Sequence, residues 1–370
     1  MTEPLLRPAY GERSLSDVVP GVAVALGAAP RGDSGLTLPE APGYVIFLID
    51  GMGETLLRRH ATLAPFLSSL VDSPGTAGVP STTATSLTSL GTGLTPGQHG
   101  LVGYTARIPG SNRLINHLAW DAGVDPLAWQ PHEPAFERLA ATDVHVTVVN
   151  RREFEGSGLT VAGQRGASFV GANKVGERIA GVLEAAGRAR SLTYVYDGDL
   201  DWTGHRHGVD SPQWREQLTA VDRIAEQMRA ALPASVRMLV VADHGMVDSP
   251  AARRIELDDE PALRDGLELV GGEARFRHLY CRAGADVDVV ATWRERLGDR
   301  ATVLLRDEVV GLGWFGPTEE RVLPRLGDVM VACHGDTAIL ATRDFPFEHK
   351  LVGLHGSLTE DEMRIPILIA

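Results

Sequence analysis

The sequence predicts an α/β fold in which a mostly parallel sheet is sandwiched between helices. Short apolar runs with the composition of fully buried strands alternate along the chain with stretches of helical apolar spacing. The pattern changes after Asp248, where short alternating strands surround one helix and indicate an inserted α+β unit. We therefore expect a core formed by residues 1–253 and 335–370, and a small cap subdomain formed by residues 254–334.

The first core strand is expected at residues 43–50, where GYVIFLID is apolar and rich in β-branched and aromatic residues. Two glycines end this strand, and a helix interrupted near Pro65 should follow over residues 56–71. The other core elements are expected as helices at 86–90, 175–186 and 212–232, and as strands at 145–149, 191–197, 236–242 and 365–370. In the cap, strands are expected at 274–282 and 302–305, with a helix at 287–297.

Length and charge limit the classes of function. The 370 residues allow one large domain with an insertion, or two domains. The formal net charge of -13 argues against a nucleic-acid polymer as the partner, because binding to a phosphate backbone needs a basic surface. A small phosphate ester remains compatible with this charge, since a bound metal ion inverts the local field.

The N-terminal apolar stretch, residues 19–29, follows no basic leader and is interrupted by Pro20 and two glycines. We identify neither a signal peptide nor a membrane span there, and we expect a cytoplasmic protein without a membrane partner. The two cysteines, Cys281 and Cys333, do not indicate a disulfide scaffold and are expected as buried apolar residues.

Acidic and histidine side chains follow three of the expected core strands, where functional groups collect in such sheets. A carboxylate at the end of an apolar strand is unfavourable unless it is paired, and three converging carboxylates repel one another. A divalent metal compensates both effects, and imidazole with carboxylate favours Zn²⁺ over Mg²⁺ or Ca²⁺. Taken alone, Asp50 could equally cap a helix. The residues are Asp50 in IDGMG, Asp201 and His205 in DWTGH, and Asp243 and His244 in ADHGM.

A nucleophile is expected in VPSTTATSLTSLGTG, residues 79–93. The segment places Thr82 and Thr83 at the start of a helix after Pro80. A hydroxyl there would be activated by the unpaired N–H groups of the helix and by an adjacent metal. Both threonines and Ser81 could also serve as ordinary N-cap residues.

The motifs ID-G, P-S-T-T…T-G…H-G, D-x-x-G-H, D-H-G-M and G-L-H-G occur in this order. Together they resemble the nucleotide pyrophosphatases/phosphodiesterases, or type I phosphodiesterases, of the alkaline phosphatase superfamily. The resemblance spans roughly residues 43–105, 190–250 and 350–370. It implies an alkaline phosphatase-like core and a hydrolase with two Zn²⁺ ions per chain, Mn²⁺ or Fe being substitutes. It also implies a small phosphate-ester substrate, cleaved at a phosphodiester or pyrophosphate bond of a nucleotide-like molecule.

Carried over residue by residue, the nucleophile falls on Thr83, with Thr92 and Gly93 at the family's own offset. The implied reaction is attack by Thr83 on phosphorus, followed by hydrolysis of a phosphothreonine intermediate. The terminal G-x-H-G motif is matched by His355 and not by His334 in ACHGD. The resemblance assigns Asp50, Thr83, Asp243 and His244 to one metal ion, and Asp201, His205 and His355 to the other.

Tyr104 stands where this family usually has an asparagine that holds a phosphoryl oxygen. A phenol can also donate a hydrogen bond, so we expect Tyr104 to border the phosphate site. The exchange leaves a phosphomonoesterase or a phosphonate (C–P) hydrolase of the same superfamily open, as well as a non-catalytic metal-binding scaffold. Trp202 and Trp120 could stack on a base or sugar, although core positions are commoner for tryptophan. No oligomeric state is predicted.

Overall fold

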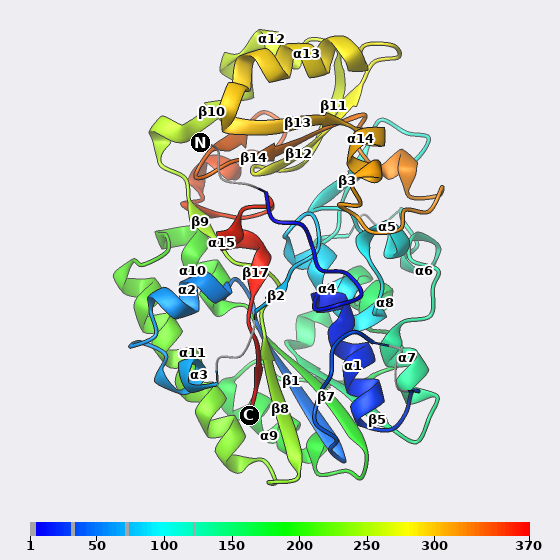
Figure 1. Cartoon of the computed structure of the whole chain (residues 1–370), viewed down its shortest axis with the longest axis vertical. Coiled ribbons are helices and arrows are strands. Elements are labelled where there is room, and N and C mark those ends of the chain that lie inside the picture. Colours follow the sequence, from blue (N-terminus) through cyan, green and yellow to red (C-terminus); the bar gives the residue numbers. More distant parts are fainter. Residues whose placement is uncertain (1–4, 31–33, 71–73, 121–122) are drawn as a thin grey trace.

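The computed structural model describes residues 5–30, 34–70, 74–120 and 123–370. Its centre is a six-stranded sheet (Figure 1). In spatial order the strands are β18 (Ile367–Ile369), β8 (Val236–Val241), β1 (Gly43–Ile49), β7 (Ser191–Asp197), β5 (His145–Asn150) and β6 (Ser168–Gly171). All neighbours run parallel except β18, which pairs antiparallel with β8. The predicted α/β class with a mostly parallel sheet is confirmed.

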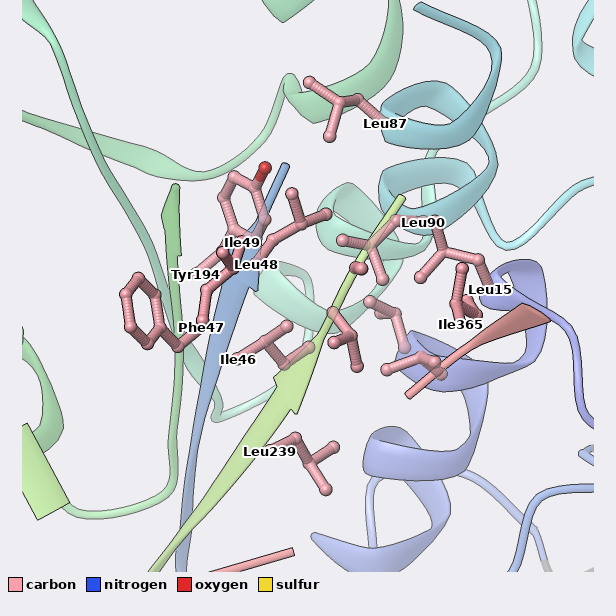
Figure 2. Close-up of a cluster of buried hydrophobic side chains, with 14 of the residues drawn as sticks. Leu15, Ile46, Phe47, Leu48, Ile49, Leu87, Leu90, Tyr194, Leu239 and Ile365 are labelled. Atoms are coloured by element: carbon pink, nitrogen blue, oxygen red, sulfur yellow. The ribbon is translucent and has the colours of Figure 1, made fainter. Parts of the chain in front are cut away.

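Helices cover the sheet on both sides, because its strands have apolar residues on both faces. Helix α9 (Val175–Ala186) packs on β1, β5 and β7. The helices α1 (Val18–Ala25), α4 (Thr83–Thr92) and α7 (Ala135–Ala140) pack on one another at the other side of the sheet (Figure 1). Figure 2 shows how Leu15 and Leu90 gather beside Ile46 of β1 and Leu239 of β8, which closes the main core.

Helix α4 begins and ends where the local sequence chemistry directs. Thr82 is its N-cap residue, with an extended backbone at φ -141° and ψ 148°, so Thr83 is the first helical residue. Gly93 ends the helix at φ 69°, a left-handed conformation that favours glycine. The predicted nucleophile segment therefore lies at a helix N-terminus, as expected.

Another predicted helix, over residues 56–71, is divided into two short ones. They are α2 (Glu54–Arg59) and α3 (Pro65–Ser69), and Val71 lies outside the described residues. Pro65 starts α3 because proline suits the first helical turn but not a helix interior.

A second, four-stranded antiparallel sheet lies above the first in Figure 1. In spatial order its strands are β11 (Leu267–Glu273), β12 (Phe276–Cys281), β14 (Val329–Cys333) and β13 (Ala301–Leu305). Helix α13 (Asp286–Leu297) covers it and buries Trp293. The sequence pattern missed β14, a fully buried run of five residues, because short apolar runs carry no periodicity. The division of the chain at residues 254 and 334 stays a prediction.

No helix among the described ranges is both long and apolar enough to cross a bilayer. Cys281 and Cys333 are free and buried.

The other helices of the described residues are α5 (Pro96–His99), α6 (Pro126–Trp129), α8 (Gly158–Gln164), α10 (Asp199–His207), α11 (Pro212–Ala231), α12 (Pro261–Arg264), α14 (Arg306–Gly311) and α15 (Glu360–Met363). The other strands are β2 (Gly75–Thr76), β3 (Thr105–Arg107), β4 (Leu114–Asn116), β9 (Val247–Asp248), β10 (Arg254–Glu256), β15 (Ala338–Leu340), β16 (Gly353–Leu354) and β17 (Arg364–Ile365).

Candidate metal centre and active site

The carboxyl ends of three neighbouring strands bring the predicted ligands to one edge of the main sheet. In the parallel register Ile49 of β1 lies beside Asp197 of β7, and Leu48 lies beside Val241 of β8. The loops that follow these strands therefore start at the same level. Asp50 follows β1 directly, Asp243 and His244 follow β8, and Asp201 and His205 lie on α10 after β7.

Asp50, Thr83, Asp243 and His244 form the first cluster. Ligand atoms of its two aspartates and its histidine all lie within 4.8 Å of one another. His244 Nε2 is 3.5 Å from Asp50 Oδ1 and 3.5 Å from Asp243 Oδ2. Thr83 Oγ1 is 3.2 Å from His244 Nε2 and 3.5 Å from Asp50 Oδ2. The fold thus gathers the four residues that the resemblance assigns to one ion.

Asp201, His205 and His355 form the second cluster. His205 Nε2 is 3.3 Å from Asp201 Oδ2, and His355 Nε2 is 3.9 Å from Asp201 Oδ1. The rings of His244 and His355 stack with their centroids 3.7 Å apart, so the two clusters adjoin. Ligand atoms of Asp201, His244 and His355 also lie within 4.8 Å of one another, which places His244 at the junction.

His334, the alternative to His355 in the sequence, lies elsewhere. Its Nε2 contacts Thr302 Oγ1 at 2.8 Å, and Thr302 belongs to strand β13 of the second sheet. The structure therefore brings His355, and not His334, to the predicted ligands.

Backbone carbonyls orient all three clustered histidines. A proton on Nδ1 that is donated to a carbonyl leaves the Nε2 lone pair free, and metal-binding histidines are commonly held in this way. The Nε2 atoms then face the clusters as acceptors. The Nδ1 contacts are His205 to Gly353 O at 2.7 Å, His244 to Gly245 O at 3.0 Å and His355 to Ser81 O at 2.9 Å.

The clustered carboxylates have the unpaired oxygens that a cation site requires. Asp50 Oδ1, Asp201 Oδ1 and Asp243 Oδ2 are buried and have no hydrogen-bond partner within the described part of the chain. Burial, and then repulsion by Asp243 and Asp201, raise the pKa of Asp50 well above its ordinary value. Buried, unpaired carboxylates are unfavourable, and a divalent ion bound by imidazole and carboxylate removes the penalty. The residues present therefore fit divalent cations held by imidazole and carboxylate groups.

Two contacts at this edge were not expected from the sequence. The Tyr196 hydroxyl donates to Asp50 Oδ2 at 2.5 Å, and Tyr196 is the next-to-last residue of β7. The contact follows from the sheet register, which places Tyr196 beside Leu48 near the end of β1, and the sequence alone does not give this register. At Gly51, φ is +72° and a Cβ would lie 3.0 Å from Asp201 Oδ1, so glycine permits the close approach of the two loops.

Glu273, at the end of β11, reaches the centre from the second sheet. Its Oε2 lies 3.7 Å from His355 Nδ1, and its carboxylate accepts hydrogen bonds from the Thr82 side chain and the Tyr104 backbone N–H. Burial raises the pKa of Glu273 to about 8. The sequence carried no signal for this residue, because no motif surrounds it and its partners lie far away in the chain.

Tyr104 adjoins this region through its backbone. Its hydroxyl oxygen accepts a hydrogen bond from Asn116 Nδ2 at 2.6 Å, which leaves the phenolic proton available to another acceptor. Burial raises the pKa of Tyr104, which keeps the phenol protonated. Tyr104 is not among the described residues that line the adjoining pocket, and its role at a phosphate stays a prediction.

A pocket of about 560 Å³ opens beside Asp50, Thr83 and Asp201. This volume lies in the range of small-molecule sites, which combine an apolar wall with a few polar groups. Trp202 is 64% exposed and Leu118 is 48% exposed, so both stand at its outer rim. Trp120, the other tryptophan considered for stacking, packs instead against the main core. The apolar wall consists of Leu87, Leu118, Phe154, Leu159, Tyr196 and Trp202.

Comparisons of the sequence with known proteins point to nucleotide pyrophosphatases/phosphodiesterases. A family model described as type I phosphodiesterase/nucleotide pyrophosphatase matches residues 44–358. Ectonucleotide pyrophosphatase/phosphodiesterase family member 7 from Homo sapiens is 34% identical over 77 residues. That stretch is 19% of this chain and only 17% of the human protein.

Solved structures show the same fold over most of the chain. Murine ectonucleotide pyrophosphatase/phosphodiesterase 5 matches with a TM-score of 0.69 and 18% identity, over 88% of this chain and 87% of that one. The human protein of the same name matches with a TM-score of 0.68, also at 18% identity and with the same coverage. An inactive form of the murine protein, solved in complex with AMP, has a TM-score of 0.67 at 18% identity and the same coverage.

Proposed function

The chain belongs to the type I phosphodiesterase/nucleotide pyrophosphatase family, and from this premise we propose that it is a di-zinc hydrolase of nucleotide-like phosphate esters. It would cleave phosphodiester or pyrophosphate bonds. The observation that carries the proposal is the position of Thr83 Oγ1, which lies 3.2 Å from His244 Nε2 at the edge of two adjoining clusters of unpaired ligands.

Seven side chains would hold the two ions. The contacts support one set made of Asp50, Thr83, Asp243 and His244, and another made of Asp201, His205 and His355. Bound zinc ions supply positive charge to phosphoryl oxygens and lower the pKa of a coordinated hydroxyl. The donor types favour zinc, with Mn²⁺ or Fe as substitutes.

Thr83 would act as the nucleophile. Its hydroxyl proton passes to solvent as Oγ1 forms a bond to phosphorus, and the bond from phosphorus to the leaving oxygen breaks, so that this oxygen departs with the bonding electron pair and takes up a proton from solvent. A water molecule then attacks the phosphothreonine and breaks the Oγ1–P bond: its oxygen stays on phosphorus, one of its protons restores the Thr83 hydroxyl and the other is released with the phosphate product. The first-turn N–H groups of α4 surround Thr83 with positive potential, which favours the anionic oxygen in both steps.

Neighbouring contacts hold this reacting group in place. The Ser86 hydroxyl donates to the Asp243 carbonyl at 2.8 Å, which ties the first turn of α4 to the loop after β8. The Tyr196 hydroxyl orients Asp50 by donating to Oδ2, the same oxygen that Thr83 Oγ1 approaches. A nucleophile held this way needs little reorganisation before attack.

The pocket beside Thr83 would receive the organic part of the substrate. Its apolar wall and the exposed indole of Trp202 suit a planar base, and Asn150, Ser157 and Gln164 add hydrogen-bonding groups. The AMP complex of the murine protein is consistent with a nucleotide here. The net charge of -13 supports a small ester over a nucleic-acid polymer, and the cytoplasmic location stays a prediction.

Tyr104, which stands where the family pattern has asparagine, supports a second candidate function, that of a phosphomonoesterase or phosphonate hydrolase. Asn116 engages the Tyr104 hydroxyl, and this arrangement differs from the single asparagine that the family pattern has at Tyr104. A changed donor near the phosphoryl group would shift the preference between diesters and monoesters.

An ester panel with and without chelator tests the proposal. We expect p-nitrophenyl thymidine monophosphate and bis(p-nitrophenyl) phosphate to be hydrolysed faster than p-nitrophenyl phosphate, and chelator to abolish all turnover. Faster hydrolysis of p-nitrophenyl phosphate would contradict the diesterase assignment. No turnover by zinc-loaded protein would favour the scaffold reading.

A further inference from the structure

Arg275 and Glu362 form a buried ion pair between the second sheet and the C-terminal segment. Arg275 lies in the turn between β11 and β12, Glu362 lies on α15, and both side chains have 0% exposure. Arg275 Nε donates to Glu362 Oε1 at 2.7 Å and Nη2 donates to Oε2 at 2.6 Å. Removing both charges from water is expensive, so such a pair is weak evidence for stability alone and points to a geometric role.

The Glu362 carboxylate also binds the loop that carries His355. Oε1 accepts a hydrogen bond from the Ser357 backbone N–H at 3.0 Å, and Oε2 accepts one from the Thr359 hydroxyl at 2.5 Å. Ser357 is two residues after His355. Because Arg275 donates a hydrogen bond to each carboxylate oxygen, it fixes the orientation of the carboxylate toward this loop.

The same residue contacts the loop of a second ligand. The Glu362 carbonyl accepts a hydrogen bond from the Gly245 N–H at 2.9 Å, and Gly245 directly follows His244. A Cβ at Gly245 would overlap the neighbouring carbonyl of Asp361, so the two segments touch backbone to backbone. Glu362 thus joins the loops of His244 and His355.

Ser81 connects the His355 loop to the nucleophile. Its hydroxyl donates to Ser357 O at 2.7 Å and accepts from the Gly356 N–H at 3.2 Å. Its N–H donates to Gly356 O at 3.1 Å, and its carbonyl accepts from His355 Nδ1 at 2.9 Å. A displacement of the segment 355–357 would therefore be transmitted to Ser81, two residues before Thr83.

From these contacts we propose that the Arg275–Glu362 pair is a positioning device for the metal centre. Its side chains hold the loop of His355, and the backbone of Glu362, which the pair keeps in place, holds the loop of His244, so that the two Nε2 atoms meet at the junction of the two clusters. The second sheet then shapes the centre without providing a ligand. The inference rests on the proposed di-metal function, and zinc binding tests it without requiring turnover.

Arg277 and Glu348 provide a matched control. Arg277 lies two residues after Arg275 and is fully buried, and its Nη2 is 2.5 Å from Glu348 Oε2. The other hydrogen bonds of this pair run to Ile339 O and the Ala341 N–H, which belong to neither ligand loop. Neutralising it removes a comparable buried pair and leaves the loops of His244 and His355 in place.

The experiment compares the double variant R275M/E362Q with R277M/E348Q. Each double variant removes both charges together, so that no buried charge is left unpaired. The single variant E362Q, which leaves the Arg275 charge unpaired, is measured in the same way and should also bind zinc more weakly than the unmodified chain. Zinc affinity is measured by competition with a chromophoric chelator, and hydrogen exchange of residues 355–359 is measured in the zinc-free protein.

We expect R275M/E362Q to bind zinc roughly tenfold or more weakly, the range for partners that orient metal ligands, and to exchange faster in this loop. R277M/E348Q should bind zinc like the unmodified chain. Unchanged zinc affinity in R275M/E362Q would overturn the proposal, and so would an equal loss in R277M/E348Q. Failure to hydrolyse any ester, with zinc affinities that follow the expected pattern, would contradict the proposed function and leave the positioning role standing.

Discussion

His205 Nε2 lies 3.2 Å from His355 Nε2, although 150 residues separate the two histidines in the chain. Each ring donates its Nδ1 proton to a backbone carbonyl, so two acceptor nitrogens face each other. Asp201 adds a carboxylate to the same space. A shared cation is the simplest partner for three converging acceptors.

Replacing His355 should remove one of two bound zinc ions. We expect His355→Ala to bind one zinc per chain in metal analysis, because it deletes a nitrogen from the Asp201–His205 cluster. His334→Ala serves as the control, since His334 contacts Thr302 in the second sheet and should leave the count at two. Loss of zinc from His334→Ala alone would reverse the ligand assignment.

Removing the hydroxyl of Thr83 should abolish the chemical step, while Asp50, Asp243 and His244 remain to hold the first ion. We expect Thr83→Ala to lower kcat roughly 10⁴-fold or more, as removal of a nucleophile does elsewhere. Thr83→Ser retains the hydroxyl and should retain measurable turnover. Its phosphoserine intermediate should be detectable when the reaction is quenched with acid. Recovery of more than a tenth of the activity in Thr83→Ala would exclude Thr83 as the nucleophile.

Zinc should stabilise the fold, because it neutralises buried carboxylates that repel one another in its absence. At free zinc one hundred times the dissociation constant, one site raises the free energy of unfolding by about 2.7 kcal/mol. Asp50→Asn should raise the Tm of the zinc-free protein and reduce the gain on adding zinc, since it removes one of the repelling charges. A zinc-free Asp50→Asn protein less stable than the parent would contradict this account of Asp50.

Trp202 should contribute to substrate binding and little to stability. It is 64% exposed at the rim of the pocket, where its indole could stack on a base. Loss of one aromatic stack costs about 1.4 kcal/mol, so Trp202→Ala should raise KM for a nucleotide ester by about tenfold. The free energy of unfolding should change by less than about 0.5 kcal/mol. Phe347 is 72% exposed and does not line the pocket, so Phe347→Ala is the control with unchanged KM. Equal KM values in both variants would exclude Trp202 from the site.

Tyr104 should donate a hydrogen bond to the phosphoryl group. Tyr104→Phe keeps the ring and removes the proton, so kcat should fall about 10²-fold, as when one oxyanion donor is lost. Tyr104→Asn restores the residue that the family pattern has there, and we expect it to raise the ratio of diester to monoester hydrolysis. Wild-type kcat in Tyr104→Phe would mean that this hydroxyl only holds Asn116.

Much of the core was predictable because its signals are local. The strand at 191–197 and the helix at 175–186 have the bounds expected from apolar composition and helical spacing. The family prediction, made from short motifs such as those around Asp50 and Asp243, is confirmed by the family model that matches residues 44–358. Parallel strands end at one edge, and this rule was enough to predict that these residues converge.

Other contacts had no signal in any window of the sequence. Glu273 reaches His355, and Arg275 pairs with Glu362 across 87 residues, because the second sheet folds back onto the C-terminal segment. Strand β14 was missed since a five-residue apolar run is compatible with several structures.

By itself, the sequence determined the fold class, the family and the chemical types gathered at the sheet edge, because each depends on residues close together in the chain. Only the tertiary structure decided how those groups are held: Tyr196 contacts Asp50, backbone carbonyls contact the three histidines, and a buried arginine–glutamate pair lies behind the loops of His244 and His355. Such contacts are made by segments that meet only on folding. The orientation of these side chains therefore depends on tertiary packing, whereas their identity is given by the sequence.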